Sequence, residues 1–412
     1  MTIGPYAAFQ FPEFRYYAVL NFLLTAALMM QEVALSYELY QLTHNPMTLG
    51  YIGLAEALPF ISLVLFGGHF ADRKDKKTIM QIGLAVITLG SLILIWVSHP
   101  ETRSQLPQTY MLLAVYGVLA LIGFAKGFYS PAASSLSPLL VPREVIPNAS
   151  TWYSVFWQTG AITGPAFGGL AYAIFGFTNT LWLIVAMLVI VMVLISLIEK
   201  KPVFDDGKPK VNIFESLREG IRYVFSTKII LYCISLDLFS VLFGGVVAIL
   251  PVFAVDILHV GALELGFLRA APSAGAILTM YGAVHFTPLN RPWRNMLIAV
   301  AGFGLATLVF AVSTNYWLSM VALFFTGAFD SISVVVRNTI MKMLPPDEMR
   351  GRVTAVNSVF VSTSNEIGAF ESGLAATLMG TVPSVIAGGL VTMVIVTVVW
   401  IRSKELFSMK LN

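Results

Sequence analysis

Twelve long apolar stretches constrain the fold of this chain more than any other feature of the sequence. A helix that crosses a bilayer needs about 20 mostly apolar residues, and twelve such stretches occur within the 412 residues. They cover approximately residues 16–42, 48–71, 78–98, 110–131, 149–175, 178–199, 229–256, 264–287, 293–313, 317–341, 353–377 and 383–402. Because little chain remains for a soluble domain, the sequence predicts an all-α membrane protein with twelve transmembrane helices.

Composition supports the same class. Hydrophobic residues make up 57% of the chain and charged residues only 11%, and the mean hydropathy is +0.80, which excludes ordinary soluble domains. The first stretch is too long and too polar for a cleavable signal peptide, so it is expected to be retained. Trp182, Trp293 and Trp317 lie near span ends and are expected to anchor at the membrane interface.

The basic residues indicate the orientation. With a cytoplasmic N-terminus, 22 of the 25 Lys and Arg residues fall on the cytoplasmic side, Arg337 among them. Arg103 then lies outside, while Lys126 and Arg269 lie in the membrane region. The positive-inside rule therefore predicts that both termini are cytoplasmic. Because topology explains the basic loops, nucleic acid is excluded as a partner.

A hydrophilic segment at 200–228 divides the chain into an N-terminal part, 1–199, and a C-terminal part, 229–412. Short matches recur at an offset of 204 residues: Ser154-Val155-Phe156 with Ser358-Val359-Phe360, Gly164 with Gly368, and Gly169 with Gly373. Parallel repeats of this kind are typical of two-bundle transporters. The sequence thus predicts two pseudo-symmetric six-helix bundles joined by a cytoplasmic linker.

The loop between the second and third stretches follows the pattern Gly-x-x-x-Asp-Arg-x-x-Lys-Lys. Asp72 near a helix start would be stabilised by the helix dipole and free backbone N–H groups, and Arg73 can pair with acids. These features predict a cytoplasmic gate formed by Gly68, Asp72, Arg73, Lys76 and Lys77. The equivalent loop at 282–295 has no Asp-Arg pair, so the gate is expected in the first half only.

The fifth stretch contains Gly160, Gly164, Pro165, Gly168 and Gly169. Glycines at this spacing allow a neighbouring helix backbone to approach closely, and the proline removes one helical hydrogen bond and bends the span. Small-residue packing alone would account for the pattern, and a functional motif is the alternative.

Ionisable and amide side chains inside the spans are the third signal, since charges in a bilayer are costly and normally face a cavity or a partner. The candidates for proton coupling or substrate binding are Glu32, Lys126, Asp237, Asp330, Asn365 and Glu366. Low-dielectric surroundings favour the neutral form of a carboxylate, so an acid here is able to take up a proton. The alternative is a structural pair of an acid with Lys126 or another cation.

These motifs resemble the major facilitator superfamily of transporters, with Asp72-Arg73 in the loop between helices 2 and 3. The glycine-proline pattern of the fifth stretch looks like the helix 5 signature of drug:proton antiporters. The segments 42–45 and 345–352 resemble the branch that contains enterobactin exporters and macrolide-efflux-like proteins. One departure is that Lys126 stands where many antiporters have an arginine-centred motif in helix 4, and lysine lacks the guanidinium fork.

The resemblance implies a monomeric bacterial inner-membrane exporter of a bulky amphiphilic small molecule, such as a drug or siderophore. Alternating access would be driven by proton entry, with no cofactor beyond the proton gradient. The alternatives are an importer or lipid flippase of the same fold, and a membrane receptor that does not transport. The histidines show no metal-binding spacing and no catalytic nucleophile motif occurs, so neither a metal site nor enzyme activity is expected.

Overall fold

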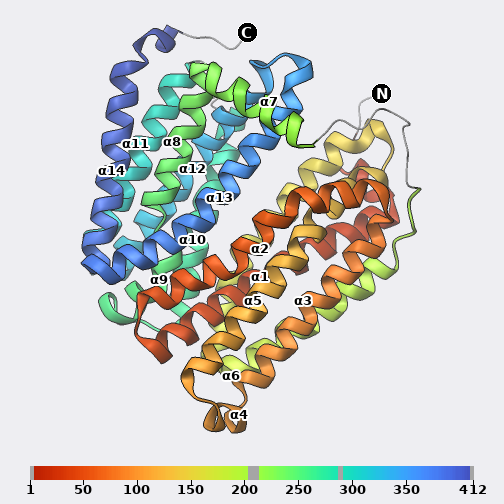
Figure 1. The fold of residues 1–412 in the computed structure, drawn as a ribbon, viewed down its shortest axis with the longest axis vertical. Helices are drawn as coiled ribbons and strands as arrows, with labels where there is room; N and C mark the ends of the chain where they lie inside the picture. The colour runs from red at the N-terminus through yellow and green to blue at the C-terminus, as the bar shows by residue number, and fades with distance from the viewer. Residues whose placement is uncertain (1–3, 203–212, 286–290, 409–412) are drawn as a thin grey trace. The chain divides into compact units, whose positions relative to one another are not determined.

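A computed structural model describes residues 4–202, 213–285 and 291–408, apart from some side chains within the helices. In that part of the chain all regular structure is helical. The helices, labelled in Figure 1, are α1 (Pro12–Thr43), α2 (Pro46–Arg73), α3 (Lys76–Ser98), α4 (Pro100–Gln105), α5 (Gln108–Leu136), α6 (Ile146–Ser196), α7 (Ile213–Ser226), α8 (Lys228–Gly244), α9 (Leu250–Val252), α10 (Ala262–His285), α11 (Pro292–Val312), α12 (Tyr316–Met343), α13 (Asp347–Met379) and α14 (Thr381–Arg402).

The predicted twelve spans are confirmed once one bent helix is counted as two. Nine segments of the described chain are long and apolar enough to cross a membrane. One of them contains α6, which consists of two spans that meet at a kink. At the kink Gly176 has a φ of 75°, which a glycine adopts easily. The remaining two spans are α10 and α13, with 24 and 33 residues, which correspond to the predicted stretches 264–287 and 353–377.

The seventh span is not the continuous helix predicted for 229–256. α8 ends at Gly244, and a 3₁₀ turn, the short α9 and a π-helical turn at Phe253–Ile257 follow. Ser372 of α13 donates a hydrogen bond of 3.0 Å to the carbonyl oxygen of Gly245. Backbone groups released by a helix break inside a membrane must find such partners, so the break is supported by α13.

The chain divides into two compact units. Unit 1 comprises Met1–Leu42, Leu54–Gly207 and Gly261–Ala270, and unit 2 comprises Thr43–Gly53, Lys208–Val260 and Ala271–Asn412. In unit 1, α3 packs against both α5 and α6. In unit 2, α11 packs against α12 and α14, and α8 packs against α13 and α14 (Figure 1). The boundaries at 199 and 229 remain predictions.

Glycines paired by the 204-residue offset occupy equivalent surroundings. A Cβ on Gly164 would lie 2.8 Å from the backbone of α1, and a Cβ on Gly368 would lie 3.2 Å from the backbone of α8. A Cβ on Gly169 would lie 2.2 Å from the start of α10, and one on Gly373 would lie 2.8 Å from the start of α2. Since α1 and α8, and likewise α2 and α10, hold matching positions in the two halves, these contacts support the internal repeat.

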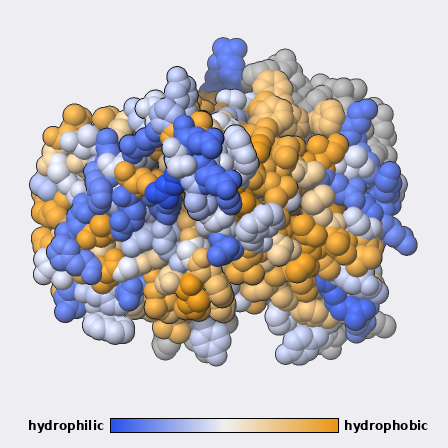
Figure 2. Space-filling model, turned by 90° about the horizontal axis from the view of Figure 1, so that it is seen from below, coloured by the Kyte–Doolittle hydropathy of each residue, from blue (hydrophilic) through white to orange (hydrophobic). Residues whose placement is uncertain are grey.

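The outward surfaces suit a lipid environment. Leu390, Val394, Val398 and Ile401 form an exposed apolar stripe on α14, and broad apolar areas are visible in Figure 2. Exposed apolar surface of this extent is typical of a membrane-embedded protein. Of the tryptophans expected at the interface, Trp182 and Trp317 are exposed, as such anchors should be.

The prediction for Trp293 was wrong. This side chain is 0% exposed, and its Nε1 donates a hydrogen bond of 2.8 Å to Ser403 Oγ. It belongs to the apolar cluster between α8, α11 and α14, where a buried indole N–H needs a partner. Trp293 therefore stabilises the packing of the apolar cluster within unit 2.

Close packing of α10 against α12 generates a stability prediction. A Cβ on Gly275 would lie 1.9 Å from the carbonyl oxygen of Phe324, so Gly275→Val must separate the two helices. Overpacking of this kind costs about 1–3 kcal/mol, and we expect a lower midpoint of thermal unfolding in detergent. Gly282→Val is the control on the same helix, because no described atom would lie within 4 Å of its Cβ. Equal midpoints for the two variants would contradict the packing argument.

Candidate functional site

Charged side chains inside the spans form ion pairs within each unit. In unit 1, Arg269 Nη2 contacts Glu32 Oε1, and Lys126 Nζ contacts Glu56 Oε1. In unit 2, Arg337 Nη1 contacts Asp237 Oδ1. Pairing is the usual arrangement of charges at membrane depth. Three of the six site candidates thus have a charged partner.

The partner of Glu32 is Arg269 rather than Lys126. Glu32 lies on α1 and Arg269 near the start of α10, with side chains that are 42% and 17% exposed, respectively. A half-exposed pair of this kind is weakened by solvent screening. Glu32 therefore forms a pair with a cation other than Lys126, which is the alternative that the sequence left open.

The glycine-proline motif of the fifth span holds α1 and α10 in place. Gly160, Gly164 and Gly168 lie on one face of α6, and a Cβ on each would come within 2.9 Å of α1. Gly169 lies against the start of α10, and Pro165 is buried beside that segment. Because α1 carries Glu32 and α10 carries Arg269, the motif fixes the two helices whose charges meet.

A second glycine places Glu56 beside Lys126. A Cβ on Gly123 of α5 would lie 2.0 Å from the carbonyl oxygen of Glu56 on α2, so the two backbones touch one turn before Lys126. Both charged side chains are partly exposed, at 29% for Lys126 and 27% for Glu56. Glu56 was not among the predicted site residues. The signal for it was Gly123, since a glycine one turn before a lysine within a span indicates a close helix contact.

The pair in unit 2 is more deeply buried. The side chains of Asp237 on α8 and Arg337 on α12 are 7% and 4% exposed. Arg337, counted above among the basic residues of the cytoplasmic side, is 3% exposed as a whole residue. The guanidinium lies within α12, where the carboxylate of Asp237 compensates a charge that would otherwise be costly to bury.

A small cavity lies beside this pair. Asp330 and Ser333 from α12 line it, together with Asp237 and Ser240 from α8. Residues three and four apart share one face of a helix, so Asp330, Ser333 and Arg337 lie on the face of α12 that meets α8. Within the described part of the chain, Asp330 has no ion pair.

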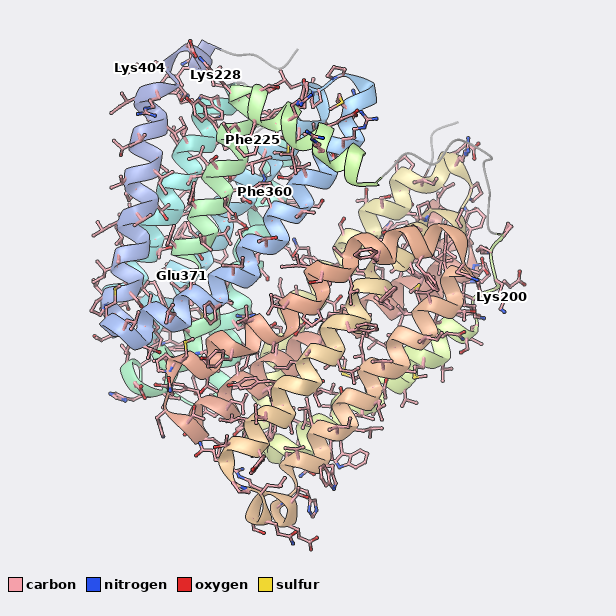
Figure 3. The ribbon with its side chains drawn as sticks, viewed as in Figure 1. Lys200, Phe225, Lys228, Phe360, Glu371 and Lys404 are labelled. Atoms are coloured by element: carbon pink, nitrogen blue, oxygen red, sulfur yellow. The ribbon has the colours of Figure 1, made fainter. Side chains whose placement is uncertain are left out.

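The two remaining candidates, Asn365 and Glu366, lie on α13. Asn365 is exposed, and its Nδ2 donates a hydrogen bond of 2.9 Å to the Val361 carbonyl oxygen of its own helix. The side chain of Glu366 lies outside the described residues. Glu371, five residues further along α13, is partly buried and labelled in Figure 3.

The predicted cytoplasmic gate is described only in part. The side chains of Asp72 and Arg73 lie outside the described residues. Asp72 belongs to the last turn of α2, and the residue that caps the start of α3 is Asp75, whose Oδ1 accepts a hydrogen bond of 3.3 Å from the Lys77 N–H. Asp72 thus lies at the end of α2, as its position near the next helix start suggested, and the carboxylate at the start of α3 belongs to Asp75.

Lys77 has a local structural partner. Its Nζ donates hydrogen bonds to the carbonyl oxygens of Ser196 and Ile198, at 2.8 Å and 2.5 Å. Ser196 is the last residue of α6 and Ile198 follows two residues later, where C=O groups have no partner within the helix. Gly68 and Lys76 lie near the end of α2 and at the start of α3. Lys77 thus ties the loop to α6 within unit 1.

Comparisons with known proteins agree with this architecture. The transmembrane secretion effector family matches residues 3–410. The enterobactin exporter EntS of Shigella dysenteriae serotype 1 is 26% identical over 384 residues, covering 92% of this chain and 88% of that protein. EntS of Citrobacter koseri is 25% identical over the same length and the same shares.

Solved structures of transporters share the fold. A POT family transporter in complex with 5-aminolevulinic acid has a TM-score of 0.76 at 13% identity, covering 95% of this chain and 96% of that one. A bacterial homologue of the lysosomal transporter Spinster, inward-facing and unoccupied, has a TM-score of 0.73 at 15% identity, covering 96% and 98%. The chain belongs to the transmembrane secretion effector family and is a secondary transporter of the major facilitator superfamily.

Proposed function

We propose that this protein exports a bulky amphiphilic small molecule, of drug or siderophore type, across the bacterial inner membrane. The observation that carries the proposal is the similarity to enterobactin exporters over 92% of the chain. Transport proceeds by alternating access, in which repeated bundles rock about a central site, and proton entry drives it.

The distribution of basic residues supports cytoplasmic termini. Lys228 and Lys404 lie at one end of unit 2, as Figure 3 shows, and Glu371 lies toward the other end. Clusters of Lys and Arg mark cytoplasmic loops. The bias does not depend on Arg337, because 21 of the other 24 Lys and Arg residues are also assigned to the cytoplasmic side.

Asp330 is the best-supported proton carrier. An acid that carries a proton through a transport cycle must gain and lose its charge, and a tight ion pair opposes that change. Glu32 and Asp237 each contact a guanidinium, whereas Asp330 lines a cavity and has no ion pair in the described chain. Burial without a cation favours a carboxylate that can be neutralised.

The transport prediction uses inside-out vesicles, in which an exporter accumulates its substrate. We expect a labelled catecholate siderophore, or a fluorescent amphiphile, to accumulate when the vesicles are energised and to leak out when nigericin collapses the pH gradient. Asp330→Asn should reduce this accumulation at least about tenfold, as expected for loss of a group needed for proton transfer. Vesicles without the protein are the control. Accumulation in energised whole cells would instead show import, and flux that ignores the gradient would refute proton coupling.

The Lys126 and Glu56 pair generates a second prediction. Lys126→Met leaves a partly buried carboxylate without its cation, and Glu56→Gln leaves the reverse, so each single change should lower thermal stability and transport. The double variant removes both charges and should recover much of the loss, with a coupling of about 0.5–3 kcal/mol in a double-mutant cycle. Unfolding midpoints and vesicle transport measure the two effects. Additive losses would indicate that Lys126 and Glu56 act separately.

A further inference from the structure

The cavity between α8 and α12 in unit 2 carries more negative than positive charge. Two carboxylates line it, from Asp237 and Asp330, and the single guanidinium of Arg337 pairs with Asp237. The rest of the described lining is apolar or hydroxylic, and it includes Val300 and Phe303 from α11. One negative charge is therefore uncompensated in surroundings of low dielectric, where electrostatic interactions are strong.

A buried hydroxyl in the same cavity also lacks a partner. Ser240 is 5% exposed, and its Oγ makes no hydrogen bond in the described chain. Buried polar atoms are nearly always satisfied, so an exception indicates something that the protein atoms do not supply. Ser331, only 2% exposed on α12, is different, because its Oγ donates a hydrogen bond of 2.9 Å to the Ala328 carbonyl oxygen of its own helix.

We propose that Asp237, Ser240, Asp330 and Ser333 form a binding site for a sodium ion. Their side chains offer oxygen atoms from two facing helices around one cavity, and hard cations prefer oxygen ligands. A single positive charge balances the uncompensated carboxylate, whereas a divalent ion would exceed it. The ion also gives Ser240 Oγ a partner.

A proton alone would satisfy only half of these observations. Protonation of Asp330 removes the excess charge but adds no further heavy atom to the cavity that could contact Ser240 Oγ. The other charged group facing the site is Arg337, already paired with Asp237. Sodium and protons therefore compete for Asp330. The sodium site deepens the proposed function, and only the role of the ion in transport rests on that function. Binding itself needs no substrate and no direction of transport.

The test is equilibrium binding of ²²Na⁺ to the purified full-length protein in detergent, with choline chloride keeping the ionic strength constant. We expect saturable binding of one sodium ion per chain, displaced by unlabelled Na⁺ better than by K⁺. Asp330→Asn should abolish it, and Ser240→Ala should weaken it about tenfold or more, as loss of a supporting ligand does. Ser331→Ala is the matched control, a buried serine with an internal partner, and should bind like the parent protein.

Several results would overturn the site. The parent protein could show no saturable binding, or Asp330→Asn or Ser240→Ala could bind sodium as the parent does. Acid could also raise the unfolding midpoint while sodium does not. If Asp330→Asn does not fold, Ser240→Ala still decides, because it removes a single oxygen. Sodium binding without export would refute the proposed function alone, and export without sodium binding would refute this site alone.

Discussion

The cost of placing a charge inside a bilayer governs the interior of this protein. Every charge kept at membrane depth needs a partner or a route to neutrality, and each pair ties together two helices that are distant in sequence. Glu32 and Arg269 connect α1 with the start of α10, and Asp237 and Arg337 connect α8 with α12. The pairs are therefore constraints on helix packing as well as functional candidates.

Glycines make these pairs geometrically possible. A charged side chain reaches its partner only if the two backbones approach closely, and in lipid that approach depends on small residues. Gly123 brings α5 against α2 beside Lys126, while Gly168 and Gly169 bring α6 against α1 and α10. The glycine-proline motif of α6 thus has a structural role that small-residue packing explains. Any role in export depends on how those same contacts change during transport.

Hydropathy and periodicity predicted the twelve spans because the bilayer imposes length and apolarity on each helix separately. The choice of partner was not predictable in this way. Glu32 pairs with Arg269 rather than Lys126, and Trp293 is buried against Ser403 rather than at the interface. Both depend on which helix faces meet, and hydropathy and periodicity along one sequence do not show that. The break after Gly244 likewise depends on Ser372 of another helix.

Asp330 matters because it departs from the general rule of pairing. A pair such as Asp237 with Arg337 has no net charge to offer, so its state changes little when an ion arrives. An uncompensated carboxylate beside an unsatisfied hydroxyl has the opposite property, since its charge is balanced when a proton or a cation binds. A ligand shifts a conformational equilibrium only through different affinities for two states. The helix contact between α8 and α12, which shapes the cavity, is therefore where ion binding and movement within unit 2 would be coupled.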